Sequence, residues 1–125
     1  MKTDPKYTEK HATSVDPKYF EDVIDGMEMV TKPGGTAFGT GIADIQICAK
    51  TGTAQNLHDN HHSLYIAFAP RDNPKIAVAV IVENAGYGAE WAAPIANLMI
   101  EKYLRPKEES KAPALFERMK NGVLF

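Results

Sequence analysis

The chain has 125 residues, of which 44% are hydrophobic and 24% charged, and its formal net charge is −2. This length suits one domain or part of one, and the composition is ordinary for a globular protein. The charge balance excludes a strongly basic surface, so we expect no nucleic-acid partner. One cysteine excludes an internal disulfide and a cysteine-rich zinc site, and the longest apolar run, seven residues, is too short to cross a membrane.

The first predicted elements are an extended arm and a helix. Residues 1–14 are polar and show no periodicity, which predicts the arm. Asp16 is a suitable N-cap and Pro17 a suitable first helical residue. Apolar residues at helical spacing follow and predict one apolar face: Phe20, Val23, Ile24, Met27 and Val30. The helix is expected to end at 33–35, which read Pro-Gly-Gly.

Three strands are predicted next, over residues 45–53, 63–69 and 75–83. The turn formers "PRDNP" separate the last two, so these strands are expected to form an antiparallel hairpin. The third strand is apolar on both of its alternating faces. This pattern predicts a central strand that is covered on both sides.

A second helix is predicted over residues 89–104, and Pro106 ends it. Its apolar stripe is expected to contain Ala92, Ile95, Ala96, Met99 and Tyr103. Residues 106–125 form a charged C-terminal tail with a short amphipathic piece around Leu115, Phe116 and Met119. The predicted fold class is α+β, with a small antiparallel sheet of about three strands packed by an N-terminal and a C-terminal helix.

Two cofactor sites can be weighed from short motifs. "DIQICAKT" has Lys50 and Thr51 where a phosphate-binding loop needs them, but Asp44 and Ala49 replace both glycines. The cluster of His58, His61 and His62 lies in the polar stretch "HDNHH", which favours a loop over a metal-binding helix. We therefore expect neither a cofactor nor a metal.

The string "KTGT", at residues 50–53, is the most informative motif. K-T-G is one of three motifs of penicillin-binding proteins and class A β-lactamases. Here it continues as "KTGTAQN", and a strand ending "FAP", the strand "IAVAVIVEN" and the helix "AAPIANLMI" follow in order. The stretch from Phe20 to Leu104 thus resembles the C-terminal part of the transpeptidase domain of class B penicillin-binding proteins, most of all the elongation or rod-shape type. Ala49 departs from the family, which usually has glycine there.

The resemblance implies a role for each residue of the motif. The motif strand is the edge strand of the active-site cleft, and a peptidoglycan stem peptide or a β-lactam lies along it by β-augmentation. Lys50 supplies positive charge, and the Thr51 and Thr53 hydroxyls reach the substrate carboxylate. Gly52 leaves room for the ligand beside the backbone. The backbone N–H of Thr53 is one of two oxyanion donors.

The nucleophile of the family is missing from this sequence. It is the serine of S-x-x-K, but the residues three places after Ser14, Ser63 and Ser110 are Pro, Ile and Pro, and S-x-N is absent as well. We therefore expect residues 15–105 to be the C-terminal portion of a larger transpeptidase domain and this chain to be inactive alone.

The resemblance also predicts where the parent enzyme works and how the fragment behaves. The parent is implied to be anchored in the bacterial inner membrane, on its periplasmic or extracytoplasmic face, with the cell-elongation machinery. The fragment itself is expected to be soluble and to self-associate through an exposed sheet edge.

Two other functions are compatible with the residues alone. The first is a stand-alone nonenzymatic module whose edge strand binds a peptide or a partner. The second is a fragment of a serine β-lactamase or of a β-lactam sensor, since these proteins share K-T-G. The context "TAQN" and "AAPIA" favours the transpeptidase.

Overall fold

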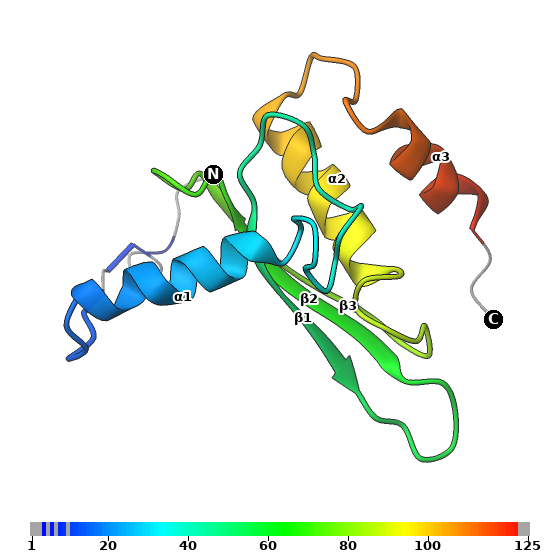
Figure 1. Ribbon diagram of the computed structural model, residues 1–125, viewed down its shortest axis with the longest axis horizontal. Coiled ribbons are helices and arrows are strands. Elements are labelled where there is room, and N and C mark those ends of the chain that lie inside the picture. The colour runs from blue at the N-terminus through cyan, green and yellow to red at the C-terminus, as the bar shows by residue number, and fades with distance from the viewer. Residues whose placement is uncertain (1–3, 5, 7, 10, 123–125) are drawn as a thin grey trace.

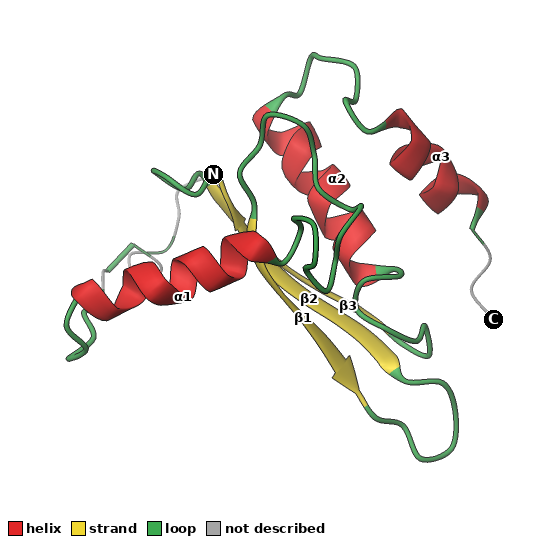
Figure 2. Ribbon diagram, viewed as in Figure 1, coloured by secondary structure: helices red, strands yellow, loops and turns green. Residues whose placement is uncertain are grey.

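The computed structural model describes residues 4, 6, 8, 9 and 11–122. Its elements in chain order are α1 (Lys18–Met29), β1 (Cys48–Ala54), β2 (His62–Ala69), β3 (Ile76–Val82), α2 (Ala92–Leu104) and α3 (Pro113–Asn121). The strands form one antiparallel sheet, α2 packs on one of its faces, and α1 packs beside β1 (Figures 1 and 2). The predicted α+β fold is confirmed, with a third helix that forms within the predicted tail.

The predicted arm and tail both extend beyond the described part of the chain. Within the arm, residues 1–3, 5, 7 and 10 lie outside it, and within the tail residues 123–125 do. The described residues of the arm belong to none of the six elements. The extents of the arm and of the tail stay predictions.

The central strand of the sheet is β2, which pairs with β1 on one side and with β3 on the other. The prediction that the third strand is central was wrong, because β3 lies at an edge of the described sheet. Val78 and Val80 of β3 are half-buried against the core, whereas Ala79 and Ile81 on the opposite face are exposed. An apolar run indicates which faces can be buried, but strand pairing decides the position in the sheet.

The strand β1 begins at Cys48, later than the predicted start at residue 45. A turn precedes it, in which Ile45 N donates to Ile42 O over 3.2 Å and Asp44 has a left-handed φ of 62°. This turn interrupts the extended backbone that the apolar pattern predicted. The other two strands match their predicted ranges within one residue, and residues 70–75 join them in the predicted antiparallel hairpin.

The start of α1 lies at Lys18, and Pro17 rather than Asp16 is its N-cap residue. Asp16 nevertheless stabilises the helix start, because its Oδ1 accepts a hydrogen bond from Lys18 N over 3.0 Å. The difference of one residue is within the range over which helix ends are defined.

The predicted apolar face of α1 is only partly covered. Ile24 and Met27 are half-buried, whereas the side chains of Phe20 and Val23 are 41% and 58% exposed. In Figure 1 the N-terminal half of α1 projects beyond the sheet. The described residues therefore bury only some of the apolar side chains on the predicted face of α1.

An ion-pair cluster that the sequence analysis missed fastens α1 to the hairpin turn. Arg71, in the turn between β2 and β3, lies 2.6 Å from Asp25, 2.7 Å from Glu28 and 3.1 Å from Glu21. The three acids recur at helical spacing and so share one face of α1. This spacing was the signal in the sequence from which an acidic face on this helix could have been predicted. Hydrogen bonds from Lys32 and then from Arg71 hold the pKa of Glu28 below its ordinary value, and Glu28 and Asp25 raise the pKa of Arg71.

We expect Glu28→Gln to destabilise the chain by about 1–3 kcal/mol at pH 7, because Glu28 is buried and binds two cations. A carboxyl whose pKa is lower in the folded state than in the unfolded state stabilises the fold fully at pH values above its unfolded-state pKa. This stabilisation is lost as the pH falls through the folded-state pKa. The variant should therefore lose less stability than wild type when the pH falls below about 4.5.

Urea unfolding at several pH values measures both effects. Glu21→Gln is the matched control, since the Glu21 side chain is 71% exposed and its pair with Arg71 should contribute about 0–1 kcal/mol. Equal losses in the two variants would contradict the importance of the buried pair.

The buried face of α2 differs from the predicted stripe. Met99 and Tyr103 were expected in it, but their side chains are 56% and 59% exposed. Pro94 lies in the first turn, as predicted. The face against the sheet is made by residues that also recur at helical spacing: Ala93, Ala96 and Ile100. The alanines allow close approach of α2 to the sheet, so small residues rather than the largest apolar ones define this interface.

The helix α3 lies antiparallel to α2 and packs on its outer side (Figure 1). Its C-terminal end is held by Arg118 Nη2, which donates to Glu90 O over 2.9 Å. Before its N-terminus, Lys111 N donates to Glu101 Oε1 over 2.7 Å. Leu115 is buried and Phe116 half-exposed, so the predicted amphipathic piece packs back on the domain.

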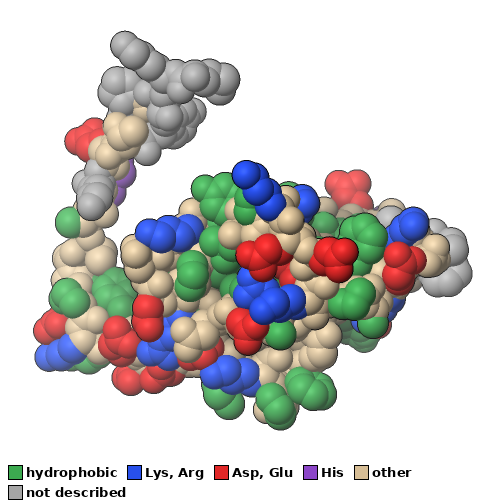
Figure 3. Space-filling view, turned by 90° about the horizontal axis from the view of Figure 1, so that it is seen from above, with side chains coloured by type: hydrophobic (Ala, Val, Ile, Leu, Met, Phe, Trp, Pro, Cys, Tyr) green, Lys and Arg blue, Asp and Glu red, His purple; other side chains and the backbone are tan. Residues whose placement is uncertain are grey.

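The charges on the surface are mixed. On the face shown in Figure 3, lysine and arginine side chains are interspersed with acidic ones, and no uniformly basic surface is visible there. Among the described helices, none has both the length and the hydropathy needed to cross a membrane.

Candidate functional site

The K-T-G motif lies on β1, at an edge of the described sheet (Figure 2). One side of β1 pairs with β2 over its whole length, from Cys48↔Phe68 to Ala54↔His62. Within the described residues the other side of β1 pairs with no strand. An extended peptide can add to such an edge through main-chain hydrogen bonds.

Lys50 extends from the sheet face opposite to α2. It pairs with Ile66, whose neighbours Tyr65 and Ala67 point the other way into the core. Ile66 is 52% exposed, so this face is uncovered in the described part of the chain. Lys50 is exposed, and its Nζ donates to the Thr51 carbonyl oxygen over 2.6 Å. The ammonium group is therefore held beside the motif strand.

The two threonines of the motif point to the other face of β1, as alternation along a strand requires. Thr51 is half-buried, and its Oγ1 lies 2.9 Å from Thr36 Oγ1, in the loop between α1 and β1. Thr53 is exposed and pairs with Ser63. The structure thus brings the four motif residues together at one edge but places Lys50 and the hydroxyls on opposite faces. The roles proposed for them stay predictions.

Gly52 is closely surrounded by backbone and side chain. A Cβ on Gly52 would lie 3.2 Å from Leu64 Cβ. A Cβ on Gly88, in the loop before α2, would lie 2.7 Å from Gly52 O. Packing therefore favours glycine at both positions, in addition to the predicted need for ligand space at Gly52. Ala49, the departure from the family pattern, is fully buried, so its methyl group fills the core.

His61, in the loop between β1 and β2, and His62, the first residue of β2, organise local backbone. His61 Nδ1 accepts from Asn56 N over 3.3 Å, and His62 Nδ1 accepts from Asn84 N over 3.0 Å. Among the described residues, no group of three or more potential ligands could hold a metal ion. His58 has no assigned role.

Ser63 has a structural role. It is fully buried, and its Oγ donates to Tyr87 O over 2.9 Å and accepts from Ala92 N over 3.1 Å. This hydroxyl thus connects the central strand to the start of α2. Ser110, in the linker before α3, donates through its Oγ to Glu101 of α2.

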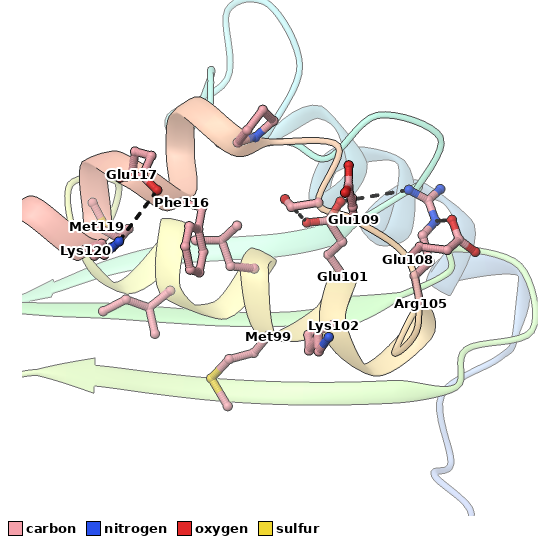
Figure 4. A pocket seen from close by; sticks show the side chains of 14 residues that line it. Met99, Glu101, Lys102, Arg105, Glu108, Glu109, Phe116, Glu117, Met119 and Lys120 are labelled. Carbon is pink, nitrogen blue, oxygen red and sulfur yellow. Dashed lines mark hydrogen bonds and ion pairs between the residues drawn. The ribbon is translucent and has the colours of Figure 1, made fainter.

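A groove of about 930 Å³ lies between α2 and α3 (Figure 4). Met99, Phe116 and Met119 provide apolar lining, while Lys102 and Glu109 are among its charged residues. The groove lies on the α2 side of the sheet, and Lys50 lies on the opposite face. It contains no residue of the motif.

Comparison with known proteins identifies the family of this chain. The family model described as "Penicillin binding protein transpeptidase domain" matches residues 2–101. The chain belongs to the penicillin-binding protein transpeptidase family. This result confirms the resemblance read from the motif strand and its context.

Individual relatives of this family agree. The peptidoglycan D,D-transpeptidase PbpA of Mycolicibacterium smegmatis is 42% identical over 93 residues, which cover 67% of this chain and 18% of the relative. The PBP2 structure from Pseudomonas aeruginosa, in complex with WCK 5153, has a TM-score of 0.63 at 39% identity, covering 71% of this chain and 20% of that one.

A third relative has a ligand of the predicted class. Penicillin-binding protein A of Mycobacterium tuberculosis, solved as a penicillin G acyl-enzyme complex, has a TM-score of 0.58 at 37% identity, covering 72% of this chain and 21% of that one. The chain therefore spans about a fifth of the length of these penicillin-binding proteins. These three relatives are transpeptidases or penicillin-binding proteins, which does not support the β-lactamase alternative.

Proposed function

We propose that this chain supplies the K-T-G strand of a serine-type D,D-transpeptidase that cross-links peptidoglycan stem peptides and is acylated by β-lactams. The observation that carries the proposal is the position of the motif on the edge of β1 that pairs with no other strand among the described residues, with Lys50 on a face that these residues leave uncovered. A stem peptide or β-lactam would lie antiparallel along this edge.

Each motif residue has a chemical role in this proposal. Lys50 attracts the substrate carboxylate and favours deprotonated groups in the cleft. The hydroxyls of Thr51 and Thr53 are short donors to the same carboxylate. The backbone N–H of Thr53 serves as one oxyanion donor, and the loss of such a donor typically costs about 10²–10³ in rate.

The remaining machinery must come from sequence outside this chain. The family nucleophile lies in S-x-x-K, which this sequence lacks, and the second oxyanion donor belongs to that serine. We place the complete enzyme on the periplasmic or extracytoplasmic face of the inner membrane, working with the cell-elongation machinery.

Labelling of the complete transpeptidase tests the function. The complete enzyme should form a stoichiometric ester with fluorescent penicillin, and an excess of D-Ala-D-Ala peptide should slow the labelling. A complete enzyme that takes no label under conditions in which a known penicillin-binding protein does would overturn the proposal.

The chain alone should self-associate as concentration rises, because in the part of the chain that the structure describes β1 has an unpaired edge and the neighbouring face is apolar. Ile66 and Ile81, on that face, are 52% and 66% exposed. We expect Ile66→Lys to shift the equilibrium toward monomer in sedimentation experiments. Tyr103→Lys, at a similarly exposed position on α2, should not shift it. A strict monomer at all concentrations would contradict this expectation.

A further inference from the structure

Thr36 lies outside the motif, and its hydroxyl contacts a motif residue. Its Oγ1 lies 2.9 Å from Thr51 Oγ1, and the geometry allows either hydroxyl to donate. We propose that Thr36 is a positioning residue: it donates this hydrogen bond and thereby directs the proton of Thr51 toward the substrate carboxylate. The inference rests on the proposed function.

The direction of the hydrogen bond decides what Thr51 can do. A threonine hydroxyl has one proton and two acceptor lone pairs. If Thr51 donated to Thr36, its only hydroxyl proton would be used. A substrate carboxylate, which can only accept hydrogen bonds, would then face a lone pair of Thr51 Oγ1 and gain no hydrogen bond from it. If Thr36 donates, the proton of Thr51 stays available to the ligand. The resulting hydrogen bond to an anion is charge-assisted, and the preceding donor strengthens it.

The loop that carries Thr36 is held on both sides. Ala37 follows Thr36, is fully buried, and its N donates to Val30 O over 2.9 Å. Gly35 precedes it and packs so closely on the end of α1 that a Cβ would collide with the Val30 carbonyl oxygen. The backbone on either side of Thr36 is therefore fixed relative to α1.

A second set of contacts connects this loop to α2. Thr40 Oγ1 donates to Ala37 O over 2.8 Å. The fully buried Asn97, in the middle of α2, donates through Nδ2 to Thr40 O over 2.9 Å. The loop that carries Thr36 toward β1 is thus held by contacts with both α1 and α2. A positioning residue requires such a fixed support.

The test compares Thr36→Val with Thr36→Ser in the complete transpeptidase. Valine keeps the shape of threonine without the hydroxyl, whereas serine keeps the donor. The rate of acylation by a penicillin should fall about 3- to 10-fold in Thr36→Val and stay near wild type in Thr36→Ser. With the methyl ester of the same penicillin, which lacks the carboxylate, Thr36→Val should have little effect.

A double-mutant cycle asks whether Thr36 acts through Thr51. Thr36→Val should add almost nothing to Thr51→Val, because the target of its hydrogen bond is already absent. Additive losses, or equal losses for the acid and the ester, would overturn the positioning role. Thermal midpoints of all variants identify any loss that comes from unfolding. A wild-type enzyme that takes no label would overturn the proposed function itself, whereas a labelled wild type with an unaffected Thr36→Val would overturn only the role of Thr36.

Discussion

In the complete transpeptidase, Lys50→Ala should slow acylation by penicillin about 10- to 100-fold while leaving the fold intact. The expected loss is that of a hydrogen bond or close contact with a charged group, which contributes about 1.5–3 kcal/mol. Lys50 is exposed, and its side-chain Nζ donates to the carbonyl oxygen of the next residue, Thr51. Removing it should therefore change the free energy of unfolding by no more than about 0.5 kcal/mol.

Stopped-flow or gel-based acylation kinetics, with unfolding curves in parallel, separate the two effects. Lys107→Ala is the matched control, because Lys107 is an exposed lysine in the linker before α3, which packs on the α2 side of the sheet. It should acylate at the wild-type rate. Lys50→Ala acylating as fast as wild type would remove Lys50 from the site.

The sequence predicted best where a local pattern and a local structure coincide. The turn formers at residues 70–74 predicted the hairpin, and the alternating apolar run predicted most of β1. The edge position of β1 was implied by the family resemblance and not by a local pattern. Pro94 was placed in the first turn of α2 because a proline is tolerated only there. Such features depend on near neighbours in the chain, so one sequence suffices to find them.

The misplaced features depend on tertiary pairing. The face of α2 against the sheet is set by which residues allow close approach, so Ala93 and Ala96 are buried while the larger Met99 is exposed. The edge position of β3 follows from its pairing partners, which no pattern within the strand specifies. Arg71 forms ion pairs with Asp25 and Glu28 of α1 only because the hairpin lies beside that helix in the folded chain.

The same distinction applies to the candidate site. Residues 50–53 were found because they are contiguous. Thr36 was not predicted as a site residue, because the loop that carries it approaches Thr51 of β1 only in the folded chain. A hydroxyl in a glycine-rich loop gives no signal in the sequence that separates it from any other loop threonine.

The last prediction is that this chain, incubated alone with fluorescent penicillin, forms no covalent adduct. Acyl transfer needs a nucleophile activated by a neighbouring base, and in this family the base is the lysine of S-x-x-K. The three serines lack that partner in the sequence. Ser63 is also fully buried, and its Oγ is already engaged with Tyr87 O and Ala92 N.

The neighbouring histidines do not replace the missing base. His61 and His62 each use Nδ1 to accept a backbone hydrogen bond from another residue, so these rings hold loops in place. Denaturing electrophoresis and intact mass of the incubated chain measure the outcome, with the complete transpeptidase as the positive control. Unmodified mass for this chain beside a labelled complete enzyme is the expected result. A stoichiometric adduct on this chain alone would show that a nucleophile other than the family serine is present, and would contradict the division of the site between this chain and the S-x-x-K half of the domain.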